Sequence, residues 1–152
     1  MIRLKVEASD DNLAVVVNSI LKELEANGCP QKIRKQIKLA VEEVFVNICS
    51  YAYESGSGMI ETETEILRDT SSKIIIRITD TGIPFDPLTG EDPDISLPIG
   101  RRPIGGLGIF MFKQIMDETV YEYKDGKNCL TMIKRFETEP YTDHIQEQIS
   151  HA

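Results

Sequence analysis

The sequence predicts an α+β fold, a two-layer sandwich in which a mixed, mainly antiparallel sheet carries helices on one face. Two observations predict this class. The expected elements follow in the order β-α-α-β-β-loop-α-β-β, and the strands fall into hairpins while the helices are grouped together. The chain has 152 residues, 41% of them hydrophobic and 28% charged, which is enough for one domain with a single core.

The N-terminal third is expected to hold one strand and two helices. Residues 2–8 alternate apolar and charged side chains, which is typical of a half-buried strand. A helix is expected from the Ser9-Asp10-Asp11 cap to about Ala26. A longer helix follows Pro30 and is expected to end near Tyr53, before a Ser-Gly-Ser-Gly turn.

The rest of the chain is expected to add four strands and a third helix. In order, these are strands 59–67 and 73–79, a helix from about Gly106 to Asp117, and strands 119–124 and 128–136. Asp125-Gly126 between the last two strands is a strong hairpin signal. The domain is therefore expected to span residues 1–136, and residues 137–152 form a polar tail.

Composition and charge exclude several classes of function. The net charge of −8 disfavours nucleic acid as a partner, because phosphate backbones require clustered Lys and Arg. No apolar run approaches the roughly 20 residues that cross a bilayer, and the N-terminus does not resemble a signal peptide. We therefore expect a cytoplasmic protein without a membrane partner. Its three cysteines, Cys29, Cys49 and Cys129, are expected to be reduced and mostly buried.

The second helix carries a possible pair of functional side chains. Glu43 and Asn47 are four residues apart and stack on one side of the helix, whereas Glu42 lies on nearly the opposite side. If one of the adjacent glutamates works in a cleft, the geometry selects Glu43. A carboxylate and an amide oxygen on one face suit a base and a hard-metal ligand, although an ordinary polar flank has the same pattern.

A long proline-rich loop separates two glycine motifs. Residues 83–104 contain five of the seven prolines and show no apolar periodicity, so we expect either a lid or a surface insertion. Before the loop, Asp80 ends the most apolar strand, where its carboxylate can accept a hydrogen bond from an exocyclic amine. Gly82 would let a flat ring approach the backbone. By itself, however, Asp-Thr-Gly is also a common turn sequence.

After the loop, a glycine cluster at 105–108 leads directly into an apolar run. Backbone amides at a glycine-rich helix start suit phosphate groups. The cluster is neither a P-loop nor a dinucleotide-binding fingerprint, and alone it could be a flexible hinge.

Taken in order, these motifs resemble the N, G1 and G2 boxes of the GHKL (Bergerat-fold) ATPases. The stretches at 39–47 and 105–110 are most similar to bacterial anti-sigma regulatory factors with serine-protein kinase activity. Met116-Asp117-Glu118 and the closing hairpin also fit that branch. The resemblance covers about residues 8–136 and implies the histidine-kinase-like ATPase fold.

The resemblance implies a role for each matching residue. Asn47 would ligate Mg²⁺ that bridges the phosphates of ATP, and Asp80 would read the adenine amino group with Gly82 beneath the ring. Glu43 would act as the general base for a substrate serine. The remaining nucleotide contacts would come from the lid and the last strand: Gly106, Leu107, Gly108 and Thr131.

The implied function is a serine/threonine protein kinase that phosphorylates a small antagonist (anti-anti-sigma) protein and regulates a sigma factor by partner switching, as a homodimer. Two departures from the family pattern leave details open. Arg101 and Arg102 lie further from the glycine box than in many relatives, and Tyr51 stands where many have a histidine.

Three alternatives remain at this stage. The protein could be an ATP-gated binding module without phosphotransfer, or a fold that has lost ATP binding. The catalytic domain of a histidine kinase is less favoured, because the only histidines, His144 and His151, lie in the polar tail.

Overall fold

The structure, a computed structural model, describes residues 1–53, 57–68, 71–88 and 112–138. Its helices and strands are, in chain order, β1 (Ile2–Glu7), the 3₁₀ turn η1 (Asp10–Asn12), α1 (Leu13–Ala26), α2 (Gln31–Tyr51), β2 (Met59–Arg68), β3 (Ser72–Asp80), β4 (Glu118–Lys124) and β5 (Lys127–Phe136). Residues 112–115 are also helical. The third predicted helix ends two residues early, and its predicted start lies outside the described residues.

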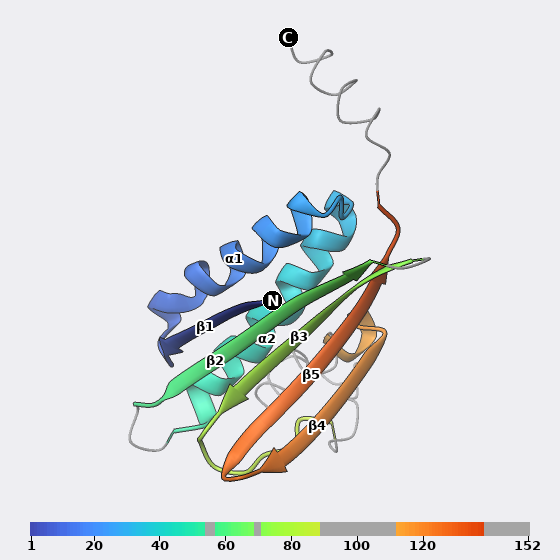
Figure 1. Ribbon diagram of the computed structural model, residues 1–152. Coiled ribbons are helices and arrows are strands. Elements are labelled where there is room, and N and C mark those ends of the chain that lie inside the picture. Colours follow the sequence, from blue (N-terminus) through green and yellow to red (C-terminus); the bar gives the residue numbers. More distant parts are fainter. Residues whose placement is uncertain (54–56, 69–70, 89–111, 139–152) are drawn as a thin grey trace, which may run out of the picture.

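The strands form one sheet in the order β1-β2-β3-β5-β4, and all its pairings are antiparallel. Figure 1 shows α1 and α2 side by side on one face of this sheet. The predicted α+β sandwich is therefore confirmed, with a sheet more uniformly antiparallel than the mixed one expected. The hairpin between β4 and β5 turns at Asp125 and Gly126, whose φ angles are both positive, 55° for Asp125 and 75° for Gly126. Such a pair is typical of a type I′ turn.

The core lies between the helices and one face of the sheet. In β3 every second side chain faces the helices, and Ile74, Ile76 and Ile78 are buried there. The helices contribute Val16, Val17, Ile20 and Leu24 from α1, and Ile37, Ala40, Val41, Val44 and Phe45 from α2. Successive side chains along a strand point to opposite faces of the sheet, so the positions of the buried residues also decide which polar side chains face α2.

The two faces of β3 provide a direct test of the packing. Ile76 is fully buried against the helices, whereas its neighbour Ile75 is only partly buried on the opposite face. Ile76→Ala is expected to lower the free energy of unfolding by about 2–5 kcal/mol, because it leaves a cavity in the core. Ile75→Ala is the matched control, with a clearly smaller loss expected in urea denaturation. Equal losses would contradict the assignment of the buried face.

Candidate nucleotide site

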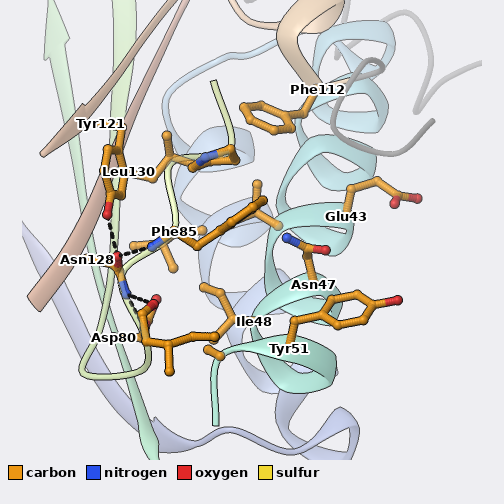
Figure 2. A pocket seen from close by; sticks show the side chains of 15 residues that line it. Glu43, Asn47, Ile48, Tyr51, Asp80, Phe85, Phe112, Tyr121, Asn128 and Leu130 are labelled. Carbon is orange, nitrogen blue, oxygen red and sulfur yellow. Dashed lines mark hydrogen bonds between the residues drawn. The ribbon is translucent and has the colours of Figure 1, made fainter. Parts of the chain in front are cut away.

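A cavity of about 310 Å³ lies between α2 and the strand ends that face it. This volume is within the range of small-molecule sites, about 300–1,000 Å³. Its walls come from α2, the end of β3, residues 83–87, Phe112, and the strands β4 and β5 (Figure 2). Most of the lining is apolar, with a few polar groups: Glu43, Asn47, Tyr51, Asp80, Tyr121 and Asn128.

Asp80 is the buried acid of this cavity. It ends β3 and is only 5% exposed. Its Oδ1 accepts hydrogen bonds from the backbone N–H of Gly82, at 2.9 Å, and from Nδ2 of Asn128, at 3.0 Å. No described residue donates to the other oxygen, Oδ2. The carboxylate is thus held in place through one oxygen while the second can accept a hydrogen bond from a ligand.

Asn128 connects three parts of the cavity wall, although its role was not predicted from the sequence. Its Nδ2 donates to Asp80 and to the carbonyl oxygen of Ile83, at 2.9 Å. Its Oδ1 accepts from the backbone N–H of Phe85, at 3.1 Å, and from the hydroxyl of Tyr121. Burial raises the pKa of the Tyr121 hydroxyl, with the charges of Asp86 and Asp80 adding to the effect. Tyr121 therefore stays protonated at neutral pH and remains a donor.

A signal for Asn128 was present in the alternation of β5. Asn128, Leu130 and Met132 share the face that packs on the helices, and a buried asparagine requires hydrogen-bond partners. The opposite face of β5 is also largely uncharged in this stretch, so the sequence alone did not decide which face was buried.

The structure places Thr131 away from the cavity. It lies on the other face of β5, where it is paired with Arg77 of β3 and Val120 of β4. It does not line the cavity. The strand alternation turns this side chain away from α2, so the structure does not support the predicted contact between Thr131 and a nucleotide, which stays a prediction.

Gly82 lies close to the backbone just beyond the end of α2, so the protein's own chain occupies the space next to it. A Cβ at this position would lie 2.3 Å from the carbonyl oxygen of Ala52, just beyond the end of α2. Next to it, the backbone N–H of Ile83 donates to the same oxygen at 2.9 Å. The structure thus gives a reason for glycine here that involves no ligand, and the contact with a ring stays a prediction.

On α2, the structure places Glu43 and Asn47 together at the cavity. Glu42 is not among the lining residues and lies 3.8 Å from Lys38, between Oε1 and Nζ. Figure 2 shows the Asn47 amide between Glu43 and Tyr51 along one side of the helix. The helical geometry that selected Glu43 over Glu42 therefore agrees with the observed cavity.

The start of the predicted lid forms part of the cavity wall. Ile83, Phe85 and Pro87 line it, and the Phe85 side chain is 54% exposed. Asp86 Oδ1 accepts from the backbone N–H of Leu88 at 2.8 Å, which fixes a local turn. The remainder of the lid and the predicted phosphate contacts at Gly106, Leu107 and Gly108 lie outside the described residues, as do Arg101 and Arg102.

Two further observations bear on the chemistry. The described part of the chain contains no group of three or more His, Cys, Asp or Glu side chains that could hold a metal ion. All three cysteines are reduced thiols, and burial raises the pKa of the Cys49 thiol to about 11, with the charge of Asp10 adding to the effect. Cys49 is therefore a neutral thiol near pH 7 and a poor nucleophile.

No described helix is long and apolar enough to cross a membrane.

Comparisons with known proteins agree with this picture. A family model described as the histidine kinase-like ATPase domain matches residues 6–134. The chain is 30% identical over 146 residues to the serine-protein kinase RsbW of Staphylococcus aureus, covering 91% of this chain and 88% of that protein. It is 28% identical over 101 residues to the serine/threonine-protein kinase BtrW of Bordetella bronchiseptica, covering 66% and 70%.

A solved structure supports the fold alone. The crystal structure of the RsbU and RsbW domains of Rv1364c from Mycobacterium tuberculosis matches 92% of this chain with a TM-score of 0.56 and 15% identity. The present chain spans 34% of that longer chain.

The Asn128 network provides a test of the cavity wall. Asn128→Ala is expected to lower the free energy of unfolding by about 1–3 kcal/mol, because buried polar groups around it lose their partners. Asn18→Ala, at an exposed position of α1, is the control and is expected to have no such cost. Urea denaturation of both variants measures the difference. An unchanged midpoint for Asn128→Ala would show that the network contributes nothing.

Proposed function

Because the chain belongs to the histidine kinase-like ATPase family, which confirms the GHKL resemblance of its motifs, we propose that the cavity beside α2 binds ATP with Mg²⁺. The observation that carries this proposal is the buried Asp80 carboxylate. Its Oδ2 is left to accept a hydrogen bond while Oδ1 is held by Gly82 and Asn128. An exocyclic amine on a flat base fits such an acceptor, and the apolar lining suits the ring.

The donor set of the cavity fits Mg²⁺ as a partner of the nucleotide. Mg²⁺ prefers oxygen ligands and usually takes only one or two from the protein, completing its shell with phosphates and water. Asn47 offers an amide oxygen and Glu43 a carboxylate on the same side of α2. The lack of a larger metal-binding cluster in the described residues is compatible with this division. Bound there, Mg²⁺ would neutralise phosphate charge.

We assign phosphotransfer to a serine or threonine of a protein substrate. The hydroxyl oxygen forms a bond to the γ-phosphorus as the bond to the bridging oxygen breaks, and ADP leaves. The hydroxyl proton passes to Glu43, which makes no hydrogen bond or ion pair with any described residue. The similarity to a serine-protein kinase and to a serine/threonine-protein kinase supports this assignment. The proposed substrate is a small antagonist protein. Its phosphorylation would regulate a sigma factor by partner switching in the cytoplasm, and the kinase would act as a homodimer.

An ATP-gated binding module is the second candidate. A catalytic base is usually oriented by another group, and among the described residues none makes a hydrogen bond or ion pair with the Glu43 side chain. In such a module, nucleotide binding would control the hold on a partner without phosphotransfer. The half-exposed aromatic side chains at the cavity, Tyr51 and Phe85, would be available for that contact.

Substitution of Glu43 tests the proposed chemistry. With labelled Mg-ATP and co-purified partner proteins, Glu43→Gln is expected to reduce transfer about 10²–10⁴-fold, because the general base is lost. ATP affinity, measured by calorimetry, is expected to stay within about twofold of wild type, since the base contributes to transfer rather than to binding.

Glu42→Gln is the matched control, because the same change is made one residue away and outside the cavity. It is expected to leave transfer unchanged. Undiminished transfer by Glu43→Gln would remove Glu43 as the base. Tight Mg-ATP binding by the wild type without any phosphorylated protein would favour the binding module instead.

A further inference from the structure

We propose that Tyr53 is a positioning residue that sets the spacing between the two ends of the nucleotide site, Asn47 on α2 and Asp80 at the end of β3. The inference rests on the proposed function, because nucleotide binding defines those two ends. Tyr53 does not line the cavity, so it would act through the elements it joins.

The hydroxyl of Tyr53 joins the end of α2 to two strands. It donates to the carbonyl oxygen of Met59 at 2.6 Å, and Met59 begins β2. It accepts from the backbone N–H of Thr81 at 2.9 Å, directly after β3. The Thr81 hydroxyl lies 3.3 Å away and completes the set as a second donor. One donor and two acceptor positions are thus all used, which is the full capacity of a tyrosine hydroxyl.

Gly58 leaves space for the Tyr53 ring because it has no side chain. A Cβ on Gly58 would lie 2.2 Å from Cε1 and Cζ of Tyr53, so any larger residue at position 58 would displace the ring. The carbonyl oxygen of Gly58 in turn accepts from the backbone N–H of Ala8, at 2.8 Å. The ring is therefore held against backbone that is itself fixed next to β1.

A second contact acts at the same place. The carbonyl oxygen of Ala52 accepts from the N–H of Ile83, and Gly82 packs against the same group without a side chain. Ala52 and Tyr53 thus join the end of α2 to residues 81–83. Asn47 lies only five residues before this junction on α2, and Asp80 lies one residue before Thr81. The junction is thus a short route of covalent and hydrogen bonds between the two ends of the site.

This arrangement predicts a specific effect on ligands that bridge both ends. Mg-ATP would use Asn47 and Asp80 together, so it benefits from a fixed spacing. Adenosine would use only the base-reading end, where Asp80 is held by Gly82 and Asn128 whether or not Tyr53 has its hydroxyl. A purely structural role for Tyr53 would instead weaken both ligands alike.

Removal of one oxygen tests the proposal. Tyr53→Phe is expected to raise the Kd for Mg-ATP about tenfold, measured by calorimetry, because the spacing is no longer fixed. The Kd for adenosine, measured by NMR titration, is expected to stay within about twofold of wild type. Tyr123→Phe is the control: it removes the same atom from a residue 46% exposed on β4, whose hydroxyl makes no hydrogen bond with any described residue.

Two more variants separate positioning from folding. Gly58→Ala displaces the Tyr53 ring and is expected to reproduce the selective loss of Mg-ATP. In an Asn47→Ala background, Tyr53→Phe is expected to cause no further loss, because one of the two ends is already gone.

The outcomes are distinct. Equal weakening of Mg-ATP and adenosine, or an unchanged Kd for Mg-ATP in Tyr53→Phe, would overturn the proposal while leaving the proposed function intact. Failure of the wild-type protein to bind Mg-ATP would overturn the proposed function, and this inference with it.

Discussion

The site depends on one buried carboxylate at the end of a central strand. A charged group that is removed from water loses hydration energy, and fixed hydrogen bonds must compensate for it. For Asp80 these bonds come from the next turn of its own chain and from Asn128 on the neighbouring strand. The strand register Asp80↔Asn128 is therefore essential. A slip of one residue would bring Cys129 opposite Asp80 and would turn Asn128 to the other face.

How β5 meets its neighbours is set by two features, the turn before it and its buried side chains. The tight turn at Asp125 and Gly126 fixes how β4 and β5 pair, and the buried alternation of Leu130 and Met132 fixes which face meets the helices. Asn128 therefore lies on the buried face, where its side chain also holds the backbone of residues 83 and 85. The same side chain thus stabilises both Asp80 in the cavity and the first residues of the predicted lid.

Much of this organisation could be predicted from the sequence, because local patterns report it. The alternation of β1 and the Asp-Gly turn before β5 each identified an element, and helical spacing separated Glu43, which lines the cavity, from Glu42, which does not. Long-range pairing could not be predicted in the same way. Both faces of β5 are largely uncharged, so the inward position of Asn128 and the outward position of Thr131 became clear only from the sheet. Similarly, glycine at position 82 looked like an opening for a ligand, whereas the structure shows Ala52 against it.

The central claim is that Asp80 accepts a hydrogen bond from the amino group of a bound adenine. It can be measured by calorimetry with wild-type protein, comparing Mg-ATP with the Mg complex of purine riboside triphosphate, which lacks only that amino group. The account predicts a loss of affinity of at least about tenfold for the analogue, because a buried carboxylate oxygen would lose its partner. Equal affinity for the two nucleotides would contradict it.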